Sequence, residues 1–398
     1  MDSTTDNVVA LSTKGDRAAS LARRFVPLRL KNARIAKRLN QAELGDAIGK
    51  TRQAVSSYEL GEKSPEAATL GAIAHVLCQP LAYFTTPDLG GFGESSARFF
   101  RAAGPDTKRR NLMCDAYAAW HVQIARYIDS LVNYAPVALP AKSPLNVGSG
   151  YEEEEIEEAA KECRSLWGLG YGPISNMLSL AESRGIIAAK LPIEGERIDA
   201  FSFWNGPRPF IFLATEKESA ARGRFDVAHE IGHLVLHQGV GQEEIEDPKA
   251  LKRIEMEANR FAGALLLPRE SFPNEVFTTR LESFVELKRR WKVAIQAMVY
   301  RCKDLGIFDE YQITNLYKQI SARKWRTKEP LDDPSLFPIE QPKTLRRAAE
   351  MVFAAGRKAP QDFVSDLALA PSVVGALCNL PSNTFAGSEV VYLEPTLK

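Results

Sequence analysis

The chain has few cysteines, no long hydrophobic run and no signal sequence, and each absence excludes a class of protein. Its five cysteines are scattered, odd in number and without a Cys-x-x-Cys pair, which argues against a disulfide framework and against cysteine-ligated zinc. No apolar run approaches the roughly 20 residues of a membrane-spanning helix. The first 17 residues are polar and lack the apolar centre of a signal peptide. We therefore expect a cytoplasmic protein that does not enter a membrane.

Histidine is also scarce, and its placement is the most informative feature of the chain. Three of the five histidines, His229, His233 and His237, fall on successive turns of one apolar segment. Residues 229–233 read His-Glu-Ile-Gly-His, and two histidines four apart on a helix can place ring nitrogens on one Zn²⁺. Glu230 would take a proton from an attacking water. Ionisable rings on a buried face are costly unless something binds them, so we interpret the segment as half of a zinc hydrolase site and His237 as a supporting or packing residue.

A third protein ligand is expected from the following helix, because catalytic zinc sites hold three protein ligands and leave one position open. Residues 253–268 have apolar side chains at helical spacing and end at a proline. Glu255 and Glu257 compete for the role, since they differ by about 200° around a helix and only one can face the metal. Glu255 is favoured because Asn259, one turn further on its face, could hold a ring N–H of His229. Glu257 is the reserve choice.

Two further runs in residues 151–268 match a known family of peptidases. They are the lead-in Glu-Ala-Ala-Lys-Glu-Cys-Arg-Ser-Leu-Trp-Gly and the run Glu-Ala-Asn-Arg-Phe-Ala. With the histidine motif, they resemble the ImmA/IrrE family of gluzincin-like metallopeptidases. The resemblance implies a zinc endopeptidase, with manganese as a substitute in vitro, in which His229, His233 and Glu255 hold the metal and Glu230 is the base. Members of this family cut helix-turn-helix repressors, usually with repressor and peptidase on separate chains.

A second, independent signal lies near the N-terminus. Residues 39–49 form an amphipathic segment that ends at a glycine, and residues 51–61 follow after a tight turn. The expected apolar face of the first segment consists of Leu44, Ala47 and Ile48. Two short helices joined in this way predict a helix-turn-helix, whose second helix enters the major groove of DNA by its N-terminal residues. Residues 16–55 hold ten Lys and Arg against three acids, a local charge of +7 in a chain of net charge +1, which favours phosphate binding.

The run Leu-Asn-Gln-Ala-Glu-Leu at residues 39–44 closely resembles the XRE family and the headpieces of phage repressors. By position, the resemblance implies that Gln41 contacts phosphate and that Arg34 pairs with Glu59 to brace the fold. The residues it implies as base-contacting are Arg52, Gln53 and Ser57. Arginine and glutamine can make bidentate contacts with purine edges, so the chemistry fits. A merely solvated helix is the alternative for these positions.

Short strands are predicted just before the histidine motif, at residues 198–204 and 209–213. Between them lies Asn205-Gly206, a strong signal for a hairpin turn. A strand beside a zinc-binding helix can hold an extended substrate by main-chain pairing. An ordinary sheet edge explains the same pattern equally well.

The whole chain is expected to be mainly α, with several domains and a small mixed α+β peptidase domain. The expected parts are a disordered tail at 1–22, an XRE-type helix-turn-helix domain at 23–86, a linker and long helix at 87–150, an ImmA/IrrE-like peptidase domain at 151–275, a second helix-turn-helix-like module at 276–325 and a C-terminal helical region at 326–398. The long helix is expected at 108–134, where it could couple head to peptidase, form a dimer seam or simply pack. The six glutamates within 152–158 are interpreted as a solvated helix start.

We hypothesise a transcriptional regulator that binds double-stranded operator DNA and cuts a peptide bond with zinc. The substrate would be a separate helix-turn-helix repressor, a neighbouring copy or the chain's own linker at residues 85–96. Headpieces of this kind usually read palindromes, so a homodimer is considered. One alternative is a transcription factor whose zinc domain senses metal or a ligand without turnover, and another is a peptidase whose head docks proteins.

Overall fold

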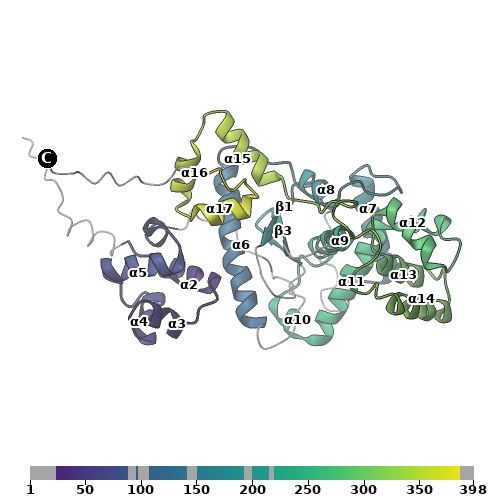
Figure 1. Cartoon of the computed structure of the whole chain (residues 1–398), viewed down its shortest axis with the longest axis horizontal. Coiled ribbons are helices and arrows are strands. Elements are labelled where there is room, and N and C mark those ends of the chain that lie inside the picture. The colour runs from purple at the N-terminus through teal and green to yellow at the C-terminus, as the bar shows by residue number, and fades with distance from the viewer. Residues whose placement is uncertain are drawn as a thin grey trace, which may run out of the picture.

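The computed structural model describes residues 24–87, 96, 107–140, 150–191, 200–214 and 219–385. It is mainly helical and holds one three-stranded mixed sheet, which confirms the expected fold class (Figure 1). The tail expected at 1–22 and the linker residues 88–95 lie outside the described part of the chain. None of the described helices combines the length and the apolar composition that a membrane-spanning segment requires.

The described residues of the N-terminal head form four α-helices and one 3-10 turn. They are α2 (Pro27–Ala36), α3 (Gln41–Ala47), α4 (Arg52–Glu59), α5 (Ala67–Leu77) and η1 (Leu81–Phe84). Asn40 begins α3 with a capping box, in which its side chain accepts from the backbone N–H of Glu43 and the Glu43 carboxylate accepts from that of Asn40. Thr51 caps α4 in the same register. The predicted helix-turn-helix is therefore present, with α4 as its second helix.

The apolar face predicted for α3 is only partly correct. Leu44 is buried and Ile48 is half-buried, but Ala47 is exposed. Gly45 is buried instead, because α3 and α4 approach each other at this position. A Cβ atom added to Gly45 would lie 2.7 Å from the backbone oxygen of Lys50. The absence of a side chain at residue 45 therefore lets the turn close.

Replacing Gly45 should destabilise the head. We expect Gly45→Ala to lower the free energy of unfolding by about 1–3 kcal/mol, since the added carbon overpacks a backbone contact. Urea denaturation of the full chain measures the change. The control is Gly71→Ala in α5, where an added Cβ meets no described atom within 4 Å. The free energy of unfolding of this variant should rise by about 0.5–1 kcal/mol, because alanine has a higher helix propensity than glycine. Equal effects of the two substitutions would contradict the packing argument.

The central sheet consists of β1 (Ile187–Leu191), β2 (Ala200–Asn205) and β3 (Arg208–Ala214). The order is β1-β3-β2, so β3 is central, parallel to β1 and antiparallel to β2. Asn205 pairs with Arg208 across a turn in which Gly206 has a φ of 55°. The predicted hairpin is confirmed, and its expected first residues 198–199 lie outside the described chain.

The two faces of this sheet belong to two different hydrophobic cores. Alternating residues of β2 and β3 point to opposite sides, as strand geometry requires. Ala200, Ile211 and Leu213 pack with the helices of the region expected from the sequence to be the peptidase domain, residues 151–275, which is called the peptidase region below. Four phenylalanines cover the other face, namely Phe201, Phe203, Phe210 and Phe212. The sheet therefore separates the peptidase core from a second core.

The second core joins the head to the C-terminal helices. It contains α6 (Thr107–Asp129), α15 (Thr344–Ala354), α16 (Pro360–Leu367) and α17 (Pro371–Cys378). The long helix α6 contacts α2 of the head and packs against the sheet (Figure 1). The helix ends at Asp129, five residues before Tyr134, the end predicted from the sequence. The chain folds back after the helix, and the Tyr134 hydroxyl donates to the backbone oxygen of Ala125. Packing between head and sheet is thus the role that the structure gives to α6.

A buried histidine in this core should make stability depend on pH. His121 packs between the rings of Phe210 and Phe212, and burial lowers its pKa to about 3. The unfolded chain binds this proton near pH 6.5, so more protons are bound in the unfolded state as the pH falls below that value. The free energy of unfolding should therefore decrease from pH 7 to pH 5. His121→Phe should reduce the decrease in urea denaturation, and an unchanged decrease would contradict the assignment.

Helices surround the sheet in the peptidase region and form the module that follows it in sequence. The helices are α7 (Glu153–Leu166), α8 (Met177–Ser183), α9 (Ala220–Leu236), α10 (Gln242–Glu246), α11 (Pro248–Leu266), η2 (Phe272–Glu275), α12 (Leu281–Trp291), α13 (Ile295–Asp304) and α14 (Glu310–Ala322). The glutamate run does start α7, with exposed carboxylates in its first turn. Glu157 differs, since it is buried and bound to Arg301 through both carboxylate oxygens.

The second helix-turn-helix-like module is packed into the peptidase core. The backbone N–H groups of Ile295 and Gln296, at the start of α13, donate to the buried carboxylate of Glu329. Lys288 of α12 is also buried, and its Nζ forms a salt bridge with the same carboxylate at 2.8 Å. The N-terminus of α13 is therefore already satisfied inside the protein, and this module packs as part of the core.

Candidate metal centre and nucleic-acid interface

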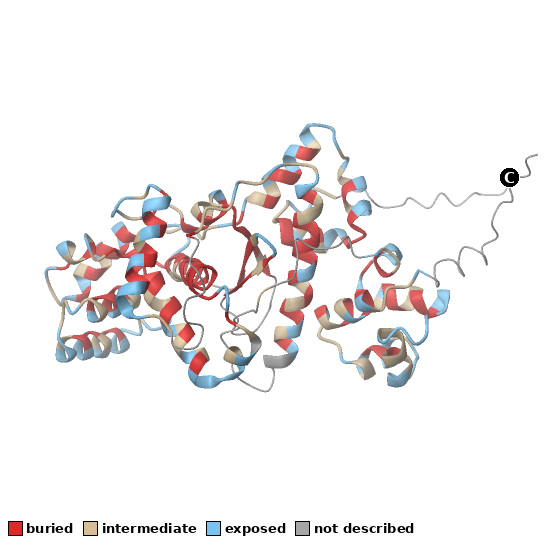
Figure 2. Ribbon diagram, turned by 180° about the vertical axis from the view of Figure 1, so that it is seen from behind, coloured by how far each residue is buried: buried red, intermediate tan, exposed pale blue. Residues whose placement is uncertain are grey.

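The histidine motif lies on α9, which is buried along most of its length (Figure 2). Ser219 begins this helix, accepting from the backbone N–H of Arg222 and donating to Asp332 at 2.7 Å. Helix α11 crosses α9 closely at Gly232, where an added Cβ would lie 3.1 Å from the ring of Phe261. The glycine inside the motif thus lets the two helices that carry the site approach each other.

The structure brings His229, His233 and Glu255 together. The Nε2 atoms of the two histidines lie 3.0 Å apart, and the carboxylate oxygens of Glu255 lie 3.5 Å from His229 Nε2 and 3.4 Å from His233 Nε2. Ligand atoms around a tetrahedral zinc, with bonds of about 2.0–2.1 Å, lie roughly 3.3 Å apart. The three side chains therefore form a candidate metal site of the right size. The histidines are buried, whereas the Glu255 side chain is 17% exposed and opens the site to one side.

Hydrogen bonds behind the two histidines fix their tautomers. Asn259 Oδ1 lies 3.1 Å from His229 Nδ1 and accepts its proton. His237 Nε2 donates to Glu257 at 2.9 Å, so His237 Nδ1 accepts from His233 Nδ1 at 3.0 Å. Both Nε2 atoms then carry lone pairs, and both face the Glu255 carboxylate. Three lone-pair donors brought together in a buried place are stabilised by a cation, and this donor set suits zinc.

The charge state of Glu255 agrees with a ligand role. Burial raises the pKa of this carboxyl, whereas the adjoining His229 and His233 rings lower it well below its usual range when they carry the proton that a bound cation would replace. The carboxylate is therefore ionised at neutral pH. Burial also lowers the pKa of His237 to about 4, which keeps its ring neutral, as the hydrogen-bond chain requires.

Glu257 is not one of the residues of the candidate metal site and lies behind it, against His237. Its carboxylate binds His237 and accepts from the backbone N–H of Tyr151 at 3.1 Å. The Tyr151 hydroxyl donates to the backbone oxygen of Leu236, the last residue of α9. His237 has the supporting position that the sequence analysis considered, but its partner Glu257 and the link to Tyr151 were not predicted.

Glu230 is buried on α9 between the two histidines, with 3% of its surface exposed. Strand β2 packs against the helix here, since Ser202 Oγ donates to the backbone oxygen of Glu230 at 3.2 Å. The outer edge of β2 pairs with a residue from the segment between head and peptidase. The Ser96 N–H donates to the Trp204 oxygen at 2.8 Å, and the Trp204 N–H donates to Ser96 Oγ at 2.9 Å.

The head presents part of the predicted DNA-contacting set. Arg52 and Gln53 are exposed at the start of α4. Ser57 is half-buried, and its hydroxyl donates to Glu62 at 3.0 Å. The predicted brace is confirmed, because Arg34 binds Glu59 through two nitrogens at 2.6 and 2.9 Å.

Gln41 also takes part in this brace. Its Nε2 donates to Glu59 at 2.8 Å, so one of its two amide N–H groups points to the scaffold. Its second Nε2–H and its backbone N–H at the helix start are the donors with which it could bind a phosphate. The sequence pattern gave its position on the helix but not this hydrogen bond.

Comparison with known proteins agrees with both parts of the site. Residues 181–303 match the peptidase family described as the IrrE N-terminal-like domain, and residues 30–84 match the helix-turn-helix family. The uncharacterized HTH-type transcriptional regulator YqaE of Bacillus subtilis (strain 168) is 36% identical over 72 residues. That match covers 18% of this chain and 57% of the regulator. The chain therefore combines a helix-turn-helix DNA-binding domain with an IrrE N-terminal-like domain that holds a His-His-Glu candidate metal site.

Proposed function

We propose that this chain is a cytoplasmic DNA-binding transcriptional regulator that hydrolyses peptide bonds at a zinc centre. Its zinc ligands are His229, His233 and Glu255. The observation that carries the proposal is the convergence of three lone-pair donors, two of them fixed in their tautomers by hydrogen bonds from behind. The match to a peptidase family supports the same conclusion.

The protein side chains divide the work as follows. Zinc bound here would supply a Lewis acid that polarises a peptide carbonyl and activates water. Glu230 takes the proton from that water and later delivers it to the leaving amine. Asn259 and His237 hold the two ligand rings in place. Strand β2, which packs on the helix at Glu230, positions an extended peptide by main-chain pairing.

We infer that the substrate is either a helix-turn-helix repressor on another chain or the segment between this protein's own head and peptidase. The second choice is supported by Ser96, which already pairs with Trp204 on the edge of β2. A cut in this segment would separate the DNA-binding head from the rest of the chain.

The test is an incubation of the zinc-loaded full chain, with and without DNA, followed by mass spectrometry of fragments. A tagged Glu230→Gln chain is mixed with the untagged native chain. Fragments of the tagged chain show cutting between copies, and fragments of the native chain alone show cutting within a chain. If neither chain is cut, and helix-turn-helix repressors encoded beside the gene also remain intact, the hydrolase proposal is wrong.

We expect the head to read operator DNA through Arg52 and Gln53. Arg52→Ala should weaken binding about 5- to 150-fold, because a bidentate contact to a base is worth about 1–3 kcal/mol. The measurement is fluorescence anisotropy at fixed salt, on a duplex selected by the full chain from a random library. A palindromic selected sequence would indicate that two copies bind together.

The matched control for this prediction is Arg346→Ala. Arg346 is a surface arginine on α15 that pairs with Glu350 at 2.8 Å. This substitution should leave the DNA affinity within about twofold of the native value. Unchanged affinity in Arg52→Ala would instead indicate that the head docks proteins.

A further inference from the structure

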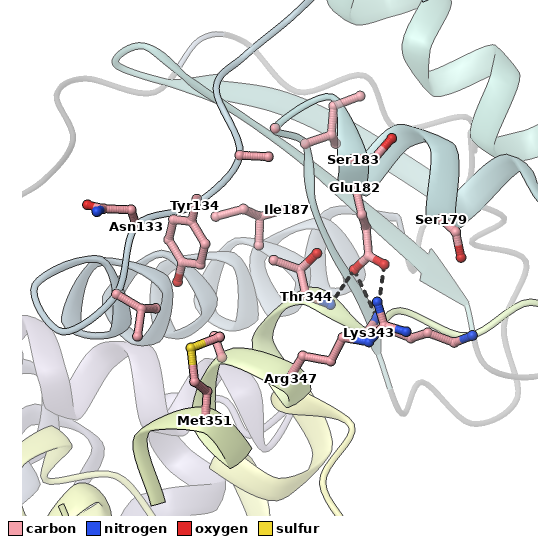
Figure 3. Close-up of a pocket in the computed structure, with 15 residues that line it drawn as sticks. Asn133, Tyr134, Ser179, Glu182, Ser183, Ile187, Lys343, Thr344, Arg347 and Met351 are labelled. Atoms are coloured by element: carbon pink, nitrogen blue, oxygen red, sulfur yellow. Dashed lines mark hydrogen bonds between the residues drawn. The ribbon is translucent and has the colours of Figure 1, made fainter. Parts of the chain in front are cut away.

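A pocket of about 280 Å³ lies where the peptidase region meets the C-terminal helices, away from the zinc ligands (Figure 3). One wall is formed by the end of α8 and the start of β1, and the opposite wall by the first two turns of α15. Residues 132–135, which follow α6, complete the lining. The pocket is therefore shared by three parts of the chain that are distant in sequence.

The floor of the pocket contains a buried carboxylate that accepts hydrogen bonds from backbone N–H groups. Glu182 of α8 accepts from the backbone N–H of Lys343 at 2.9 and 3.0 Å and from that of Thr344 at 2.8 Å. Figure 3 shows these bonds at the start of α15. They anchor α15 to α8, and together with the charge of the nearby Arg347 they oppose the effect of burial, which raises the pKa of this carboxyl.

Two cations lie at the rim, and neither is held in a salt bridge among the described residues, although Arg347 acts on Glu182 electrostatically. Lys343 and Arg347, one helical turn apart, both line the pocket and are exposed. Neither side chain forms a salt bridge or a hydrogen bond with any residue that the structure describes. The charged lining residues are these two and Glu182, so two positive charges and one negative charge leave a formal charge of +1.

The remaining lining is largely apolar. Ile186 and Ile187 are buried at the start of β1, and Ala348 and Met351 project from α15. Figure 3 places Ile187 and Met351 on the side of the pocket that also holds Tyr134. An occupant would therefore need an apolar body on this side and an acceptor group at the rim.

We propose that this pocket binds a small organic monoanion, a carboxylate with an apolar body. Its carboxylate would pair with Arg347 and Lys343, since arginine offers a planar pair of donors to a carboxylate. The volume corresponds to roughly nine or ten non-hydrogen atoms, at about 30 Å³ each, the share of a water molecule in the liquid. The occupant would bridge the peptidase region and α15, and so stabilise their contact.

The test uses hexanoate and its neutral isostere hexanamide as probes of the full chain. Methionine methyl groups are labelled for NMR, and the Met351 signal is assigned by its loss in Met351→Leu. Hexanoate should shift the Met351 signal at a concentration about tenfold lower than hexanamide needs, as expected for a hydrogen bond to a charged group. The exposed Met256 on α11 is the internal reference and should not respond.

Two arginine variants complete the test. Arg347→Gln should remove the preference for hexanoate, whereas Arg346→Gln, whose native side chain pairs with Glu350, should keep it. Both residues lie on the surface of α15, and the unchanged Met113 and Met298 signals report that each variant is folded. The proposal is overturned if Met351 does not respond to hexanoate, responds equally to both probes, or keeps its preference in Arg347→Gln.

Discussion

Glu230→Gln is expected to lower the rate of peptide cleavage by about 10²- to 10⁴-fold while the zinc content stays unchanged. The amide keeps the size of the side chain but cannot accept the proton of the attacking water. Glu230 is not one of the three side chains whose donor atoms meet at the candidate metal site. Fragment formation by mass spectrometry and metal content by elemental analysis measure the two quantities on the same preparation.

The control for this variant is Glu243→Gln, which changes an exposed carboxylate on α10. It should leave both the cleavage rate and the zinc content unchanged. Cleavage at the native rate by Glu230→Gln would contradict the assignment of the base. If the variant also preserves regulation in cells with metal bound, the domain is a metal or ligand sensor without turnover.

Removing the carboxylate of Glu255 is expected to have the second large effect, a loss of bound zinc. Glu255→Ala deletes one of three converging donors, so we expect zinc affinity to fall by more than 100-fold. Glu257→Gln weakens the support behind His237 and should lower the affinity by about 10- to 100-fold. Competition with a chelator of known affinity measures both variants.

The comparison of the two glutamates identifies the third ligand. A larger loss in Glu257→Gln than in Glu255→Ala would contradict the assignment of Glu255. Asn259→Ala provides a second check, because it removes the hydrogen-bond partner of His229 Nδ1. It should lower the zinc affinity by about 10- to 100-fold, as expected for Glu257→Gln.

The sequence predicted the site well where local periodicity decides the geometry. His229 and His233 are one turn apart on any helix, and the 200° difference between Glu255 and Glu257 follows from helix geometry alone. Which of the two carboxylates meets His229 and His233, rather than His237, depends on how α9 and α11 cross. The structure places that crossing at Gly232 and Ala258, a contact between segments distant in sequence.

Long-range contacts also explain the other differences. Glu329 satisfies the start of α13 from 34 residues away, and no local pattern announces this contact. The exposure of Ala47 follows from the crossing of α3 and α4 at Gly45, which a helical wheel of α3 does not contain. The core shared by the head, α6 and the C-terminal helices also depends on long-range contacts. Linkers separate these parts in the sequence, so no local pattern predicts that they pack together.

Anomalous diffraction at the zinc absorption edge, on crystals of the zinc-loaded full chain, tests the central claim most directly. We predict one strong peak per chain, about 2.0–2.1 Å from His229 Nε2, His233 Nε2 and a carboxylate oxygen of Glu255. No peak between these three side chains, or a peak bound by other residues while these three point apart, would contradict the assignment of this chain as a zinc peptidase.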